Sequence, residues 1–202
     1  LSSMKILAFT DIHGSSMALK RIRQKTIAQK PDILVCCGDI SIFEHGVVSI
    51  LKKLDKLGKT IIVHGNHESE STFAKVSKSL KNIIYIHKNH FVNENYLFLG
   101  YGGDGFSFID KDFEKLSKKF NKILRKNKEK KIILVTHAPP YNTKLDRLYS
   151  GHCGNKSIRN FAEKNKIDLL ICGHLHENFG KEDRIKKTKI INPGPFGKII
   201  RV

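Results

Sequence analysis

Five short apolar runs alternate with segments of helical periodicity, and this alternation is the feature that most limits how the chain can fold. The runs cover residues 5–9, 32–37, 59–63, 131–135 and 168–172. They are almost continuously apolar, which is typical of strands in a sheet that is buried on both faces. Strands that alternate with helices build α/β folds. The sequence therefore predicts an α/β protein whose main strands are covered by helices.

The segments between these runs predict the helices, and the remaining segments predict further strands. Helices are expected from Ser15 or Ser16 toward Lys30, from Val47 to Leu57 with Gly58 as the C-terminal cap, and at 71–80, 111–131 and 157–165. Strand-like pieces within 83–101 and two strands in the tail at 185–202 suggest a second, mixed sheet. No linker divides the chain, so we predict one domain from 4 to 202. Residues 1–3 resemble a cloning remnant before a natural start at Met4.

The chain carries a strong positive charge on an otherwise ordinary globular composition. It has 37 Lys and Arg against 19 Asp and Glu, which gives a net charge of +18. The densest basic segment is the helix expected at 111–131. Its outer face is either solvated surface or a surface that attracts phosphate. Aromatic residues do not alternate with the basic ones, which argues against binding of single-stranded nucleic acid.

The sequence gives no sign of a membrane or of an oxidising compartment. No apolar run is long enough to span a bilayer, and the N-terminus lacks a secretory pattern, so we predict a cytoplasmic location. The four cysteines do not form the CxxC pairs of a zinc site. Cys36, Cys37 and Cys172 lie in apolar runs, where cysteine packs as a small hydrophobic residue.

Residue types that commonly act as metal ligands follow each of the five apolar runs. They are, in chain order, Asp11 and His13; Asp39; Asn66, His67 and Glu68; His137; and His174 and His176. Ligands bind at the carboxyl ends of strands in α/β sheets, so these loops are expected to open on one rim. Carboxylate, imidazole and carboxamide groups together favour Mn, Fe, Zn, Co or Ni over Ca or Mg. So many candidate ligands suit two ions that share a carboxylate better than one four-coordinate ion.

The spacing within the motifs indicates which side chains could share an ion. Asp11 and His13 would project to the same side of an extended backbone and could reach one ion. His174 and His176 have the same spacing but follow a glycine, where the chain can turn, so they could face different ions. Asp39 is the natural bridge, because it offers two oxygens and follows a glycine that lets the backbone come close.

Together, these motifs resemble the signature of the calcineurin-like metallophosphoesterases. They are Asp11-Ile12-His13, Gly38-Asp39, Gly65-Asn66-His67-Glu68, Thr136-His137 and Gly173-His174-Leu175-His176. The resemblance covers almost the whole chain and implies an α/β fold, a four-layer α/β/β/α sandwich with two mixed β-sheets. It also implies two divalent ions, with Mn expected first and Fe, Zn, Ni and Co as alternatives. The implied ligands are Asp11, His13 and His176 for one ion, Asn66, His137 and His174 for the other, and Asp39 as the bridge.

The same resemblance implies the chemistry. A member of this family is expected to hydrolyse phosphodiester or phosphomonoester bonds by in-line attack of a metal-bridging hydroxide. His67 is implied to be the acid that protonates the leaving oxygen rather than a ligand, so His67, Asp39 and Asn66 form the expected catalytic set. Glu68 is expected to orient His67. The expected partner is a small phosphoester substrate.

Other residues and other functions remain open at this point. His152 lies in a glycine-rich loop and His45 follows the Gly38-Asp39 loop, so both are candidate substrate contacts. Asp104 either forms a turn or borders the site. The positive charge raises a metal-dependent nuclease as the alternative, although the chain has little room for a recognition domain and nucleic acid is not favoured. A non-catalytic scaffold of the same fold is a second alternative, which the complete motif set argues against. The sequence names neither the substrate nor the oligomeric state.

Overall fold

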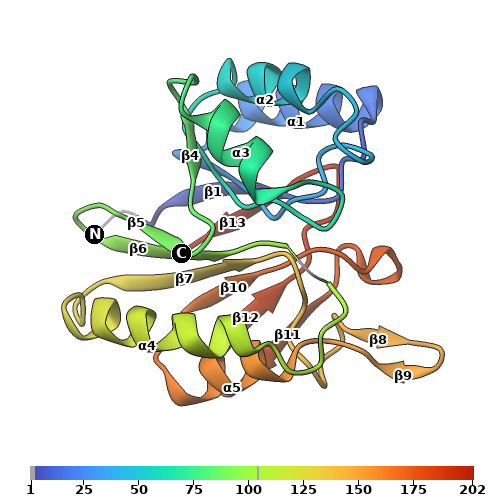
Figure 1. Cartoon of the computed structure of the whole chain (residues 1–202). Helices are drawn as coiled ribbons and strands as arrows, with labels where there is room; N and C mark the ends of the chain where they lie inside the picture. Colours follow the sequence, from blue (N-terminus) through green and yellow to red (C-terminus); the bar gives the residue numbers. More distant parts are fainter. Residues whose placement is uncertain (1–2, 104) are drawn as a thin grey trace.

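Two β-sheets lie face to face between two layers of helices in the computed structural model, which describes residues 3–103 and 105–202 (Figure 1). The first sheet has the strand order β13-β1-β2-β3-β4. Its strands are β1 (Lys5–Phe9), β2 (Ile33–Cys36), β3 (Thr60–Ile62), β4 (Ile83–Tyr85) and β13 (Lys198–Arg201). The first four are parallel, and β13 is antiparallel to β1. The helices over its outer face are α1 (Ser16–Gln29), α2 (Val47–Asp55) and α3 (Glu70–Ser77).

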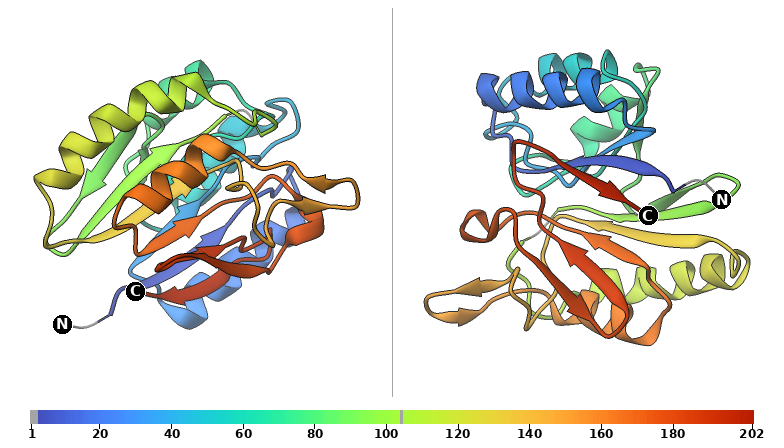
Figure 2. Two further views of the ribbon diagram at one scale, coloured as in Figure 1. Left: turned by 90° about the horizontal axis from the view of Figure 1, so that it is seen from below. Right: turned by 180° about the vertical axis from the view of Figure 1, so that it is seen from behind.

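The second sheet has the order β11-β12-β10-β7-β6-β5. Its strands are β5 (Asn89–Val92), β6 (Tyr96–Tyr101), β7 (Lys131–Thr136), β10 (Leu169–Ile171), β11 (Glu182–Ile185) and β12 (Thr188–Ile191). The four inner strands are parallel and the two edge strands are antiparallel to their neighbours. The helices α4 (Lys111–Arg125) and α5 (Lys156–Lys164) cover its outer face. A short ribbon of β8 (Arg147–Leu148) and β9 (Gly151–His152) projects from the sandwich (Figure 2).

Three apolar clusters hold the four layers together. The central cluster joins the sheets through residues such as Ile6 and Val35 of the first and Phe98 and Ile133 of the second. A second cluster lies between the second sheet and α4 and α5, and a third lies between the first sheet and α1, α2 and α3. Burying apolar area on both faces of each sheet is the main source of stability for such a fold. The predicted four-layer α/β/β/α sandwich is confirmed.

The helix starts follow from capping side chains. Ser15 caps α1, since its hydroxyl oxygen accepts a hydrogen bond from the Ala18 backbone N–H at 3.2 Å. Asp110 caps α4 in the same way, accepting from the Phe113 N–H at 2.9 Å. Such caps satisfy backbone donors that have no partner inside the helix. No helix within residues 3–103 and 105–202 combines the length and the apolar character that a membrane span requires.

Several expected boundaries and pairings were wrong. Helix α2 ends at Asp55, and its C-cap is Lys56 in a right-handed conformation, so Gly58 lies beyond the cap. Helix α4 ends at Arg125 rather than near 131. The tail strands do not all join the second sheet, because β13 pairs with β1 of the first. Strand pairing is a tertiary choice that local apolar patterns do not encode.

Candidate active site

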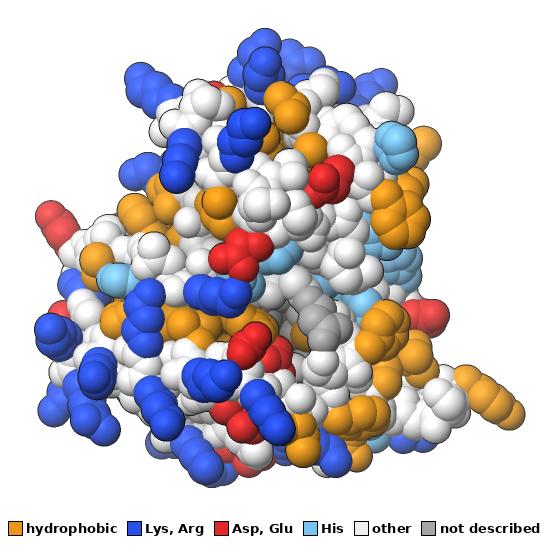
Figure 3. Space-filling model, viewed as in Figure 1, with side chains coloured by type: hydrophobic (Ala, Val, Ile, Leu, Met, Phe, Trp, Pro, Cys, Tyr) orange, Lys and Arg blue, Asp and Glu red, His pale blue; other side chains and the backbone are white. Residues whose placement is uncertain are grey.

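The carboxyl ends of the two sheets meet at one edge of the molecule, and the five candidate loops converge there. The loops after β1, β2 and β3 come from the first sheet, and those after β7 and β10 come from the second. Hydrogen bonds join the two sets: the His174 N–H donates to Asp11 Oδ2 at 3.0 Å. The His137 Nδ1 lies 2.8 Å from the carbonyl oxygen of Cys37. The expected rim is therefore built by two sheets, and histidine side chains gather at one side of the molecule (Figure 3).

Asp11, His13 and His176 form the first ligand group, with one potential ligand atom from each within 4.8 Å of the others. His13 Nε2 lies 3.1 Å from His176 Nε2, and Asp11 Oδ1 lies 3.6 Å from the same atom. The spacing of Asp11 and His13 in the sequence had suggested an extended backbone, but the structure does not have one here. Asp11 and His13 have φ values of 52° and 46°, in the left-handed region that non-glycine residues seldom adopt. A left-handed turn, and not strand alternation, brings the two side chains together.

Asn66, His137 and His174 form the second group. Asn66 Oδ1 lies 2.9 Å from both His137 Nε2 and His174 Nδ1. His137 is fully buried. Its Nδ1 faces the carbonyl oxygen of Cys37, which can only accept, so the proton of a neutral ring stays on Nδ1 and the Nε2 lone pair faces Asn66. That arrangement suits a metal ligand whose orientation is fixed by a second hydrogen bond.

Asp39 lies between the two groups. Its Oδ2 is 3.7 Å from His13 Nε2 and 3.5 Å from His137 Nε2. The preceding Gly38 has φ +100°, and a Cβ there would lie only 2.7 Å from the Gly65 Cα. Only glycine lets the two loops approach this closely. The Asp39 carboxylate thus lies within 4 Å of an imidazole from each group.

Glu68 ties the Asp39 loop to the loop after β3. Its buried carboxylate accepts hydrogen bonds at 2.8 to 3.1 Å from the backbone N–H groups of Asp39, Ser41 and Gly65 and from the Ser41 hydroxyl. Burial raises the pKa of Glu68 in spite of these donors. The expectation that this side chain orients the His67 ring differs from the structure, where its hydrogen bonds hold the backbone around Asp39.

The electrostatics favour positive charge between the ligands. Burial raises the pKa of Asp39, but its interactions with His137 outweigh this and bring the value to about 2. Burial lowers the pKa of His137, yet the hydrogen bond and charge of Asp39 raise it to about 9. In the protein alone a proton on His137 supplies positive charge at the place where a cation would lie. Burial lowers the pKa of His174 to about 4, so that ring is neutral at pH 7 and has a lone pair to offer.

The residues present fit divalent metal ions. Asn66 Oδ1, His137 Nε2 and His174 Nδ1 come from three different loops, and the oxygen lies 2.9 Å from each nitrogen. This spacing is close to the roughly 3 Å expected for adjacent ligands about 2.1 Å from one ion. The mixed oxygen and nitrogen donors suit the later first-row divalent ions.

His67 lines a cavity of about 330 Å³ that is also lined by residues of both ligand groups. Its backbone N–H donates to Asp39 Oδ1 at 2.9 Å, and its Nε2 is 4.0 Å from Asp39 Oδ2. The ring packs edge-on against His13 at a centroid distance of 4.7 Å. The cavity is lined by His13, Asp39, Asn66, His67, Phe106, Leu148, His174, Leu175, His176 and Glu177.

Two candidate substrate contacts lie away from this cavity. His152 donates from Nδ1 to Oδ1 of the buried Asp146 at 2.7 Å, and it borders a separate cavity beside Lys144 and Arg147. His45 is exposed in the turn after the Asp39 loop and is not part of the cavity lining. The structure brings neither to the ligand groups. Asp104 lies outside the described residues.

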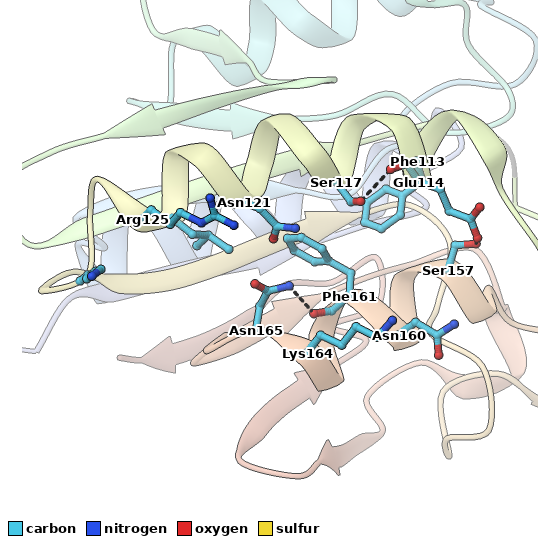
Figure 4. A pocket seen from close by; sticks show the side chains of 12 residues that line it. Phe113, Glu114, Ser117, Asn121, Arg125, Ser157, Asn160, Phe161, Lys164 and Asn165 are labelled. Atoms are coloured by element: carbon cyan, nitrogen blue, oxygen red, sulfur yellow. Dashed lines mark hydrogen bonds between the residues drawn. The ribbon is translucent and has the colours of Figure 1, made fainter.

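The basic helix α4 borders a different cavity, of about 550 Å³, between α4 and α5 (Figure 4). Phe113 and Phe161 line it, and Arg125, Lys128 and Lys164 bring positive charge to it. This groove lies on the outer face of the second sheet (Figure 1), away from the ligand groups at the sheet edge. The phosphate-attracting surface considered from the sequence is therefore separate from the candidate metal centre.

Three aromatic residues pack on site histidines without having been predicted from the sequence. The ring of Phe43 lies 4.7 Å from that of His67, and the ring of Phe106 lies 4.4 Å from that of His174. Phe179 stacks on His176 at 4.9 Å. Phe43 follows the Gly38-Asp39 motif by a few residues, and an aromatic residue in a polar loop beside a motif is the signal that could have indicated it.

The chain belongs to the calcineurin-like phosphoesterase family, a family of metal-dependent hydrolases of phosphoric esters. The sequence profile of the calcineurin-like phosphoesterases matches residues 4–178, which include all five loops of the site. Among individual relatives, the uncharacterized protein MJ1162 of Methanocaldococcus jannaschii is 34% identical over 202 residues, covering 95% of this chain and 88% of that protein.

Solved structures of the same fold come from several organisms. The protein TT1561 of Thermus thermophilus superposes with a TM-score of 0.76 at 16% identity, covering 96% of this chain and 91% of that one. A dimetal phosphatase from Danio rerio superposes with a TM-score of 0.67 at 10% identity, covering 95% and 87%. At these identities the likeness establishes the shared fold.

Proposed function

We propose that the chain hydrolyses phosphodiesters or phosphomonoesters with two divalent metal ions, of which Mn²⁺ is the first candidate. The observation that carries this proposal is the meeting of two ligand groups at one carboxylate. Asp39 Oδ2 lies within 3.7 Å of His13 Nε2 in the first group and within 3.5 Å of His137 Nε2 in the second. Two ions that share a carboxylate are a recurring device for phosphoryl chemistry.

Each ion has its own set of ligands in this proposal. Asp11, His13 and His176 would hold one, Asn66, His137 and His174 would hold the other, and Asp39 would contact both. Bound there, the ions would make water a stronger acid and would neutralise charge on the phosphoryl oxygens. The similarity to a dimetal phosphatase fold supports a pair of ions over a single one.

His67 supplies the proton in the proposed reaction. The oxygen of water bonds to phosphorus, the bond from phosphorus to the ester oxygen breaks, and His67 gives a proton to that leaving oxygen. The hydrogen bond from the His67 backbone to Asp39 Oδ1 fixes the acid relative to the bridging carboxylate. The ring faces the cavity and takes part in neither of the two proposed ligand sets.

The test compares metal-free, reconstituted and substituted protein. Dialysis against a chelator should abolish hydrolysis of bis(p-nitrophenyl) phosphate and p-nitrophenyl phosphate, and Mn²⁺ should restore it. His67→Ala should still bind two Mn²⁺ per chain but lose about 10²- to 10⁴-fold in kcat. His90→Ala is the matched control, because His90 lies on the edge strand β5 outside the cavity lining.

Two outcomes would contradict the proposal. One is binding of a single ion at saturation, measured by metal analysis and calorimetry. The other is full loading with two ions and no turnover of any phosphoester. Parallel reconstitution with Fe, Zn, Ni and Co ranks the alternatives to Mn²⁺, since the donor set alone does not choose among them. The cytoplasmic location stays a prediction from the sequence.

A further inference from the structure

The cavity at the candidate metal centre differs in charge from the rest of the molecule. The chain has 37 Lys and Arg, yet neither residue type occurs among the described residues that line this cavity. The charged side chains of its lining, histidines aside, are the carboxylates of Asp39 and Glu177. Positive side chains are spread over other parts of the surface (Figure 3). Apart from metal ions, the site therefore offers few positive groups to a second phosphate.

The groove between α4 and α5 shows that the fold can place cations beside a cavity. Arg125, Lys128 and Lys164 line that groove, and two of them are labelled in Figure 4. A polyanion such as nucleic acid is held mainly by Lys and Arg on its successive phosphates. Their absence from the described lining of the candidate active site disfavours a polyanionic substrate there and argues against the nuclease alternative.

Apolar side chains, and not Lys or Arg, surround the ligand groups in the described part of the chain. Phe43 is 72% exposed although its ring lies 4.7 Å from that of His67. Phe106 is 64% exposed although its ring lies 4.4 Å from that of His174. Phe106 and Leu148, the latter from the projecting β8–β9 ribbon, line the cavity, and Phe43 packs on His67, which also lines it. Exposed apolar side chains gathered around a polar site mark a surface that covers a ligand.

The rings of Phe43 and Phe106 come from loops of different sheets and pack on different histidines of the site. Phe43 belongs to the loop after β2 and packs on the proposed acid, so a group beside it would be the one that receives the proton. Phe106 belongs to the loop between β6 and α4 and packs on a proposed metal ligand. The leaving alcohol is thereby assigned to the side of the cavity where His67 lies, with Phe43 next to it.

We propose that the substrate is an ester of a single phosphoryl group whose leaving alcohol is apolar or aromatic and packs on Phe43, with Phe106 and Leu148 contacting the rest. This inference rests on the proposed function, because it names the substrate class of that site. In the reaction water adds its oxygen to phosphorus, the apolar alcohol departs with the proton from His67, and the proton lost by water restores the histidine. Burying a second aromatic ring against Phe43 should favour the larger alcohol.

The experiment compares leaving groups of similar acidity but different apolar area. The Mn²⁺-loaded protein is given methyl phenyl phosphate, methyl 2-naphthyl phosphate and a single-stranded oligonucleotide. We expect kcat/KM for the naphthyl ester to exceed that for the phenyl ester by roughly 5-fold, from the extra apolar area that is buried. Phe43→Ala should remove this preference and Phe43→Leu should keep part of it. Ile27→Ala is the control, since Ile27 is 63% exposed but lies near the far end of α1.

A binding measurement separates failure of this inference from failure of the proposed function. Calorimetry with 2-naphthylmethylphosphonate and methylphosphonate should show tighter binding of the naphthyl compound, and Phe43→Ala should abolish the difference. Equal binding of the two, a preference that survives Phe43→Ala, or faster cleavage of the oligonucleotide would overturn the inference. Loss of turnover on all esters with the binding preference intact would instead refute the proposed hydrolysis alone.

Discussion

Replacing Glu68 by glutamine should weaken both the fold and the metal centre, because this one carboxylate serves four donors. Oε1 accepts from the Ser41 N–H and hydroxyl, and Oε2 accepts from the N–H groups of Asp39 and Gly65. Glutamine keeps one oxygen and presents an NH₂ group to the other two donors. Two buried donors then lose their acceptor, at about 1–3 kcal/mol each, so Glu68→Gln should lower the free energy of unfolding by about 2–6 kcal/mol.

Glu68→Gln should also lower the affinity for metal ions. The Asp39 backbone loses one anchor, and supporting hydrogen bonds of this kind typically affect metal affinity by about 10- to 100-fold. Urea unfolding in chelator measures the stability effect without metal, and Mn²⁺ calorimetry measures the affinity. Glu44→Gln is the matched control: Glu44 accepts from the Ser69 N–H and hydroxyl at the surface, so its change should stay within about 0.5 kcal/mol. Wild-type stability and affinity in Glu68→Gln would refute the reasoning.

Burial and backbone geometry lead to three further predictions. Burial lowers the pKa of His87 to about 4, and the unfolded side chain takes up its proton near pH 6.5. Unfolding is therefore favoured as the pH falls from 6.5 to 4. In urea titrations, His87→Gln should make the loss of stability between pH 7 and pH 5 smaller by about 1–2 kcal/mol. An unchanged dependence of stability on pH would contradict this. Gly38→Ala should destabilise the protein by about 3 kcal/mol or more, read from thermal unfolding, because a Cβ would lie 2.7 Å from the Gly65 Cα. His176→Ala should leave the metal-free stability nearly unchanged, since the side chain is 53% exposed, but should reduce Mn²⁺ affinity at least about 10-fold; equal affinity would remove His176 from the ligand set.

The sequence predicts the main strands and the converging motifs because both are local patterns. Each candidate ligand loop directly follows an apolar run, and the carboxyl ends of parallel strands collect at one edge of a sheet. Asp11 and His176 stand far apart in the chain yet meet because the carboxyl ends of β1, in the first sheet, and of β10, in the second, lie at the same side of the sandwich. The resemblance to the phosphoesterase family added the division of the sandwich into two sheets, which apolar periodicity alone only suggested.

Features that depend on contacts between loops could not be derived in this way. The left-handed backbone at Asp11 and His13 is imposed by hydrogen bonds to the neighbouring loop, so the extended geometry expected from spacing does not hold. Glu68 follows His67 in the sequence, but its acceptors face the Asp39 loop. His152 looked available in a glycine-rich loop, whereas Asp146 binds its ring in the fold.

The antiparallel pairing of β13 with β1 also sets an order of events during synthesis. β1 is translated long before its partner, Lys198–Arg201, so one flank of the strand has no neighbour while the intervening chain is made. An uncovered strand edge readily pairs with another chain. Until that last strand is made and docks, this edge of β1 stays open to pairing with another chain, so substitutions that weaken the docking of Lys198–Arg201 should lower the yield of folded protein.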